Sequence, residues 1–285
     1  MKIVVLVFQR LGRTLLLLAL VAIGTMMLMR FAPGYFSDSR EMDAKYAQRE
    51  RSALEAEEVQ QGTFRALATS TFGGWLHGDL GLSRQYGVPV TELVGPRLRV
   101  TALLLLKGIL FGWLLALCTA FPLSVARRAG SIGGVPFTLL LAIPTGAMAT
   151  LCLLANFGGP VLVLTLLLAA RDFKFLHRLF TSAWTAPHLL QARARGIRFS
   201  RLAWAHLFWN VAPQILALAT LSLVTALSAI VPIEVIFDVP GVGQLAWTAA
   251  MNRDLPVLMT ITLLMAVMVS CAGMLSPRVR TVQPA

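Results

Sequence analysis

The chain has 285 residues, of which 57% are hydrophobic and only 13% are charged, and its mean hydropathy is +0.74. Its apolar residues come in blocks of about 18 or more, which is long enough for a helix to cross a bilayer. Because a backbone in lipid must pair its amide groups internally, this composition excludes an ordinary soluble domain and favours an all-α polytopic membrane protein.

The N-terminus joins a basic start to a long apolar run, MKIVVLVFQRLGRTLLLLALVAIGTMMLMR. That combination is typical of a signal peptide as well as of a first membrane span. No small-residue cleavage site follows the run, and the chain stays hydrophobic to its end. We therefore expect a retained first span.

Six spans are predicted, at about residues 11–30, 99–123, 134–156, 159–176, 211–233 and 255–275. The fourth is the weakest, because Arg171 and Asp172 end its apolar run early. Lys107 is the one charged side chain expected at membrane depth, about eight residues into the second span. It could serve a function there, or its long side chain could extend to the nearby interface.

Orientation follows from the Lys and Arg residues in the connections. With the N-terminus inside, the cytoplasmic segments hold 14 basic residues and one acidic residue, whereas the external segments hold 10 basic and 12 acidic residues. Both termini are therefore predicted to be cytoplasmic. The net charge of +12 is a topology signal and does not indicate a nucleic-acid partner. The external segment 31–98 is rich in Ala, Glu, Arg and Gln in its first half, which predicts a solvated helix.

Motifs of common catalytic sites are missing from the sequence. We find no GxxxxGK[ST] phosphate loop and no HExxH, CxxC or GxSxG motif. The four histidines lack ligand spacing, and Cys118, Cys152 and Cys271 lack pairing or metal spacing. The chain is therefore not expected to be an enzyme, to hydrolyse a nucleotide itself, or to bind a metal or cofactor.

The stretch LLQARARGIRFSRLAWAHLFWN (189–210) stands between two spans, on the predicted cytoplasmic side. It carries four arginines, an apolar side, and Gly196 as the cheapest place for a tight bend. A short helix, a bend and a second helix would form a knob that docks into a cytoplasmic partner. The same residues would equally suit an amphipathic helix lying on anionic lipid. The residues alone leave both readings open.

A second unusual stretch, DVPGVG, follows the fifth span on the external side. Pro240 cannot continue a helix, and Gly241 and Gly243 allow tight turns. Acidic residues flank the stretch, with Glu234 before it and Asp254 just before the last span. A re-entrant or capping turn over the external mouth of a pathway fits this pattern, and so does an ordinary hairpin.

The arginine-rich stretch resembles the cytoplasmic EAA loop of ABC importer permeases of the dipeptide, oligopeptide and nickel permease family. The family's ARAKG core is matched by Ala192, Arg193, Ala194, Arg195 and Gly196. His206 and Asn210 follow the glycine at the matching spacing. Four further stretches resemble family motifs in the family's order, namely FAPG (31–34), WLHGDLGLSRQYGVPVTELVGPRL (75–98), IEVIFDVPGVGQLAWTAAMNRDLPVL (233–258) and SPRVR (276–280).

The resemblance implies a type I ABC importer fold in a bacterial inner membrane. Residues 1–98 would hold the first span and the external segment, and residues 99–285 the permease core with a coupling loop at about 177–210. Expected partners are a second homologous permease, two ATPase subunits that bind the ATP, and an external solute-binding protein. Ala192 would pack the coupling helix and Gly196 would bend it, while His206 and Asn210 would fix the loop to the next span. The expected external gate or turn consists of Glu234, Pro240, Gly241, Gly243 and Asp254.

The cargo implied by the resemblance is a peptide or a similar small solute. The sequence departs from the family pattern at several places, with Leu190 where an acid is usual, His188 near the usual tyrosine, and Ser276 for the tail aspartate. Two other functions therefore stay open, a non-transporting scaffold derived from such a permease and a stand-alone secondary transporter. The scarcity of acids at membrane depth argues against the second.

Overall fold

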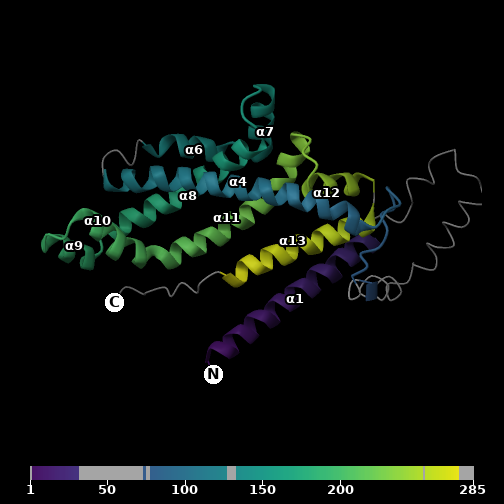
Figure 1. Ribbon diagram of the computed structural model, residues 1–285, viewed down its shortest axis with the longest axis horizontal. Coiled ribbons are helices and arrows are strands. Elements are labelled where there is room, and N and C mark those ends of the chain that lie inside the picture. Colours follow the sequence, from purple (N-terminus) through teal and green to yellow (C-terminus); the bar gives the residue numbers. More distant parts are fainter. Residues whose placement is uncertain (1, 32–72, 75–77, 127–132, 253, 276–285) are drawn as a thin grey trace, which may run out of the picture. The chain divides into compact units, whose positions relative to one another are not determined.

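The computed structural model describes residues 2–31, 73–74, 78–126, 133–252 and 254–275. Within this part of the chain the regular elements are helices, apart from one isolated antiparallel bridge between Leu82 and Pro89. In chain order (Figure 1) they are α1 (Lys2–Phe31), α4 (Val90–Val125), α6 (Val135–Ala142), α7 (Thr145–Leu154), α8 (Pro160–Trp184), α9 (Pro187–Ala194), α10 (Phe199–Arg201), the π-helix η2 (Leu202–Phe208), α11 (Trp209–Ile236), α12 (Val242–Met251) and α13 (Leu255–Leu275).

The predicted spans coincide with helical segments of this structure. By length and apolar composition, α4, the continuous helix Phe199–Ile236 and α13 can each cross a membrane, and α6 with α7 adds a fourth span if the bent pair is counted as one. The predicted all-helical polytopic fold is confirmed. The helix expected in the first half of the external segment lies outside the described residues, as do SPRVR and most of FAPG.

The third predicted span is broken, because α6 and α7 meet at an angle of 98°. Pro144 stands at the break, and Ile143 before it has φ −83° and ψ 124°, an extended conformation. A proline clashes with a helical conformation of the residue that precedes it, so the sequence itself ends α6 here. With 8 and 10 residues, the two halves are about 12 and 15 Å long, and neither can cross a bilayer alone.

Helix α8 is longer than the predicted fourth span and continues for 25 residues to Trp184. Asp172 lies near its middle, is fully buried, and accepts a hydrogen bond from the Ser222 hydroxyl of α11 at 2.7 Å. Arg171 donates to the carbonyl oxygen of Leu221 at 3.0 Å. Helix α8 is not among the described helices that can cross a membrane by length and apolar composition, so the fourth span and the place of Lys107 at membrane depth stay predictions. Lys107 itself is exposed on α4.

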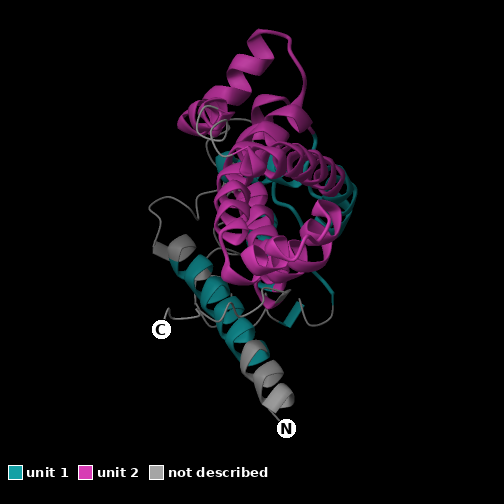
Figure 2. Cartoon of the chain, turned by 90° about the vertical axis from the view of Figure 1, so that its left-hand side faces the viewer, with its two compact units in different colours: residues 1–100, 240–270 teal, residues 101–239, 271–285 magenta. Residues whose placement is uncertain are grey.

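Packing divides the chain into two compact units, which Figure 2 shows in different colours. Unit 1 consists of residues 1–100 and 240–270, and unit 2 of residues 101–239 and 271–285. In unit 1, Val90 and Val94 at the start of α4 pack with residues of α12 and α13. In unit 2 the core is built around α8, which packs against α6, α7, α9 and α11.

Two glycines bring α4 close to α8 within unit 2. A Cβ placed on Gly112 would lie 3.0 Å from Leu168 Cβ and 3.3 Å from the carbonyl oxygen of Thr165, and one on Gly108 would collide with the side chain of Leu164. Small residues four positions apart let two membrane helices approach at close range. The spacing GILFG (108–112) carries this signal in the sequence.

We expect Gly112→Leu to destabilise the protein by about 1–3 kcal/mol, because the larger side chain overpacks the contact between α4 and α8. Thermal unfolding of the purified protein in mild detergent measures the effect. Gly95→Leu in the same helix is the matched control, since a Cβ at Gly95 meets nothing within 4 Å. Equal losses of stability in the two variants would contradict this account of the packing.

Candidate coupling loop and external turn

The candidate coupling loop begins with α9, whose first residue is Pro187. Proline suits this position, because the first helical residue needs no hydrogen-bonded amide and a fixed φ helps the helix to start. The helix ends in a Schellman cap around Gly196, which has φ +71°. Gly196 N donates to the carbonyl oxygen of Arg193 at 3.0 Å, and Ile197 N donates to that of Ala192 at 3.4 Å. Only glycine adopts this backbone conformation without steric cost.

The loop has one buried side and one exposed side. Leu189 and Ala192 are buried in the core of unit 2, together with Leu202 and Leu207 of η2. The remaining members of the predicted ARARG set are exposed, and so are the two arginines that follow, which gives an exposed set of Arg193, Ala194, Arg195, Gly196, Arg198 and Arg201. The core thus holds the loop by its apolar side and leaves a cationic face open to a partner.

Aromatic and polar contacts attach the loop to its neighbouring helices. The rings of Trp184 and Phe199 stack at 5.5 Å, and Trp184 Nε1 donates to Ser124 Oγ at the end of α4, at 3.2 Å. Asn210 Nδ2 lies 3.3 Å from His188 Nε2, so the start of α11 is linked to the start of α9. The sequence singled out Asn210 but missed this partner.

His206 lies in η2, where the chain winds as a π-helix for seven residues before α11 begins. The side chain of His206 is exposed, and Trp204 and Phe208 of the same element stack on each other at 5.2 Å. Short π-helical segments occur often at functional sites. His206 therefore lies on the surface of the loop, whereas Asn210 makes the side-chain contact between α11 and α9.

The residues of the expected external turn are divided between the two units. In unit 2, Glu234 is fully buried near the end of α11 and accepts a hydrogen bond from Thr101 Oγ1 at 2.7 Å. Helix α11 ends at Ile236, and Asp238, two residues later, has φ +51° and donates from its backbone N to the carbonyl oxygen of Val235. Val239 N donates to that of Glu234 at 2.9 Å. This is the same cap as at Gly196, with aspartate in place of glycine.

In unit 1, the remaining external residues surround the start of α12 and of α13. Pro240 is the first residue of this part of the unit, Gly241 precedes α12 in an extended conformation, and Gly243 is buried inside the helix. Asp254 is fully buried just before α13. The sequence placed all four residues in one turn, and the structure adds the contacts of Asp254.

Asp254 closes the loop that leads into α4. Its carboxylate accepts hydrogen bonds from the Ser83 hydroxyl and from the backbone N of Arg84 and Gln85, the last two at 3.3 and 3.2 Å. The loop is held at its base by Val90 N, which donates to the carbonyl oxygen of Gly81 at 3.0 Å. A carboxylate with several donors is a strong buried anchor. The GDLGLS and NRDLP motifs contain this pair, but their contact across the sequence was not predicted.

Several known proteins are similar to this chain in sequence. Residues 108–283 match the family model described as binding-protein-dependent transport system inner membrane component. Over 238 residues the chain is 28% identical to an oligopeptide transport system permease protein of Bacillus subtilis (strain 168), covering 72% of this chain and 74% of that protein. It is 25% identical to a dipeptide transport system permease protein of Lactococcus lactis subsp. cremoris (strain MG1363), covering 92% and 91%. It is 24% identical to a nickel import system permease protein of Staphylococcus aureus (strain bovine RF122 / ET3-1), covering 87% and 81%.

The chain therefore belongs to the family of binding-protein-dependent transport system inner membrane components. It is a multi-pass inner-membrane permease component of an ABC importer, and it is a transport subunit rather than an enzyme. Permeases of this family bind no cofactor, since ATP is hydrolysed by partner ATPases, and a solute-binding protein belongs to the system. Family membership argues against the stand-alone secondary transporter.

We expect Asp254→Ala to lower the free energy of unfolding by about 2 kcal/mol, because the buried Ser83 hydroxyl and two partly buried backbone amides lose their charged acceptor. Thermal unfolding and limited proteolysis of the loop 81–90 measure the change. Glu92→Ala removes an exposed acid of the same unit and should leave both readouts near those of the parent protein. A loop that is cleaved at the parent rate in Asp254→Ala would refute the anchoring role.

Proposed function

We propose that this chain forms half of a translocation pathway for peptides or similar small solutes, paired with a second homologous permease. Two cytoplasmic ATPase subunits drive the transport, and an external solute-binding protein delivers the cargo. The relatives named for oligopeptides and dipeptides support a peptide cargo, and the relative named for nickel marks the other solute class of the family.

The observation that carries the coupling role is the two-sided loop at residues 188–210. Its apolar side is fixed in the core of unit 2, and its exposed face carries Arg193, Arg195, Arg198 and Arg201. A flexible loop would absorb a movement of the ATPase, whereas an anchored one passes it on to α8 and α11. We assign Ala192 to the packing of this loop, Gly196 to its bend, and Asn210 to its attachment. His206 and the exposed Ala194 belong to the face that meets the ATPase.

On the external side we assign a closing role to the two acid-anchored ends. Glu234 with Thr101 fixes the external end of α11, and Asp254 with Ser83 fixes the loop before α4. Between them, Pro240 and Gly241 precede α12, and Gly243 is buried inside it. Each acid holds its end rigid within its own unit, and we assign these residues to the external gate.

The proposed orientation places both termini and the coupling loop in the cytoplasm, because the arginines gather on that side. We expect a membrane-impermeant maleimide to label Tyr86→Cys in intact cells and to label Ser200→Cys only after the membrane is opened. Both positions are exposed in the structure. The three native cysteines are replaced first. Labelling of Ser200→Cys in intact cells would reverse the orientation.

The coupling assignment is tested at Gly196 in the reconstituted complex of permeases, ATPases and binding protein. We expect Gly196→Pro to abolish solute-stimulated ATP hydrolysis, because proline excludes a positive φ and removes the amide that bonds Arg193, at a cost of about 3 kcal/mol or more.

Gly196→Asn is the matched variant, since asparagine tolerates the left-handed conformation and a Cβ at this position meets nothing within 4 Å. We expect it to retain stimulation. Undiminished stimulation in Gly196→Pro would refute the coupling role. A proline variant that still co-purifies with ATPases, but only at basal turnover, supports it. A parent complex that assembles without any stimulated turnover points to the scaffold.

A further inference from the structure

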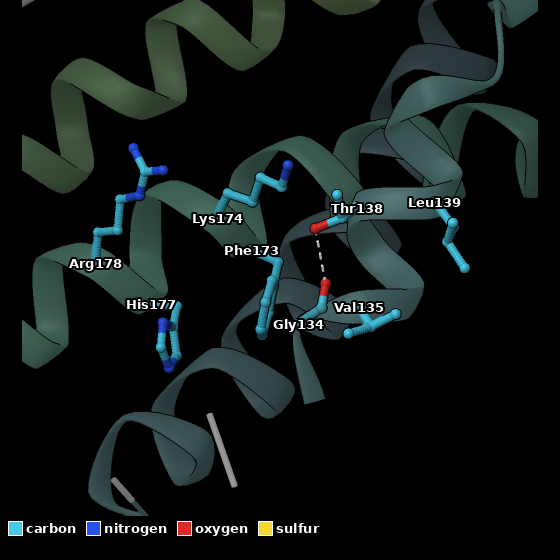
Figure 3. Close-up of a pocket in the computed structure, with 8 residues that line it drawn as sticks. All are labelled: Gly134, Val135, Thr138, Leu139, Phe173, Lys174, His177 and Arg178. Carbon is cyan, nitrogen blue, oxygen red and sulfur yellow. Dashed lines mark hydrogen bonds between the residues drawn. The ribbon is translucent and has the colours of Figure 1, made fainter. Parts of the chain in front are cut away.

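Unit 2 contains a pocket of about 320 Å³ between α6 and α8, outside the loop at residues 188–210. Figure 3 shows its side chains on two neighbouring ridges of α8, with Lys174 and Arg178 on one ridge and Phe173 and His177 on the other. The opposite wall is the first part of α6, where Val135 and Leu139 lie among the lining residues.

The pocket is cationic on one side and apolar on the other. Lys174, His177 and Arg178 supply nitrogen donors from three positions of α8, and none of the described residues that line the pocket is an acid. Asp172 turns toward Ser222 in α11. Val135 and Leu139 have exposed fractions of 51% and 64%, so apolar surface reaches the mouth of the pocket.

The floor of the pocket is rigid. The Phe173 ring stacks on Phe137 of α6 at a centroid distance of 4.1 Å and on the His177 ring at 5.6 Å. The Thr138 hydroxyl donates to the carbonyl oxygen of Gly134 at 3.0 Å, which ties the first turn of α6 together. Stacking between Phe173 and Phe137 thus fixes the contact between α6 and α8. Figure 3 shows Lys174 and Arg178 on one side of α8, and Phe173 and His177 on the other.

The pocket lies toward the end of unit 2 that carries the coupling loop. A Cβ on Gly133, just before α6, would touch the Leu123 side chain near the end of α4, and Ser124 bonds Trp184 at the end of α8. In the orientation proposed above, this end faces the cytoplasm, and the pocket lies where α6 enters the membrane. Phospholipid headgroups of the inner leaflet are found at this level, and basic pockets between membrane helices on this side bind anionic lipid.

We propose that this pocket binds a phosphate-bearing anion, presented as the headgroup of an anionic phospholipid of the inner leaflet. The phosphate contacts Lys174 and Arg178, and an acyl chain lies along Val135 and Leu139. The inference rests on the proposed orientation but not on the transport cycle, and binding is measured without ATP or solute, so a failure here is separate from a failure of coupling.

The test uses the purified complex in mild neutral detergent, titrated with fluorescent phosphatidylglycerol and followed by anisotropy. We expect saturable binding that weakens about fivefold for each cation removed, and about 25-fold in the double variant Lys174→Gln/Arg178→Gln. The charge-preserving variant Lys174→Arg/Arg178→Lys should bind as the parent does. Lys107→Gln removes a different exposed cation and should also leave the affinity unchanged.

Three results would overturn the proposal. The first is parent-like affinity in the double glutamine variant. The second is an equal loss in Lys107→Gln, or equally tight binding of fluorescent phosphatidylcholine, either of which means unspecific adsorption. The third is displacement of the lipid by inorganic phosphate at equal concentration, which identifies the ligand as a free phosphate. Thermal unfolding of each variant confirms that it is folded before it is titrated.

Discussion

A carboxylate inside an apolar helix bundle needs hydrogen-bonding partners, and at the centre of unit 2 the Ser222 hydroxyl supplies one to Oδ2 of Asp172. Asp172 is fully buried, so without a partner it would be a large cost to the fold. Because α11 supplies the partner, α8 and α11 are held in one register. The close contact at Gly108 and Gly112 then fixes α4 on another side of α8. Helix α8 becomes the fixed element around which unit 2 is arranged.

The position of the candidate coupling loop, residues 188–210, depends on this arrangement. It leaves α8 at Trp184 and enters α11 at Trp209, so both of its ends belong to the two helices that Asp172 and Ser222 hold together. The Phe199 ring and the contact between Asn210 and His188 add a third and a fourth point of attachment. In the proposed coupling role, a force on the exposed arginines would therefore act on α8 and α11 together.

The sequence predicted those features that depend only on residues close together in the chain. Apolar blocks located the helices, and Gly196 marked a bend. The bend of the third span at Pro144 had a local signal too, but a long apolar block outweighed it. Contacts between distant positions could not be predicted, because the residues of one segment do not indicate which other segment packs against them. The contact of Asp172 with Ser222 and the donors around Asp254 were therefore found only in the structure.

The break between α6 and α7 has a consequence for hydration. The last carbonyl groups of α6 and the first amide groups of α7 lack helical partners, and Leu141, Ala142 and Pro144 at the break are exposed on this chain. Lipid tails cannot satisfy such groups, and irregular backbone at membrane depth survives only against protein or water. For a bent span with its break at membrane depth, the exposed backbone at Pro144 requires water or a neighbouring subunit rather than lipid tails.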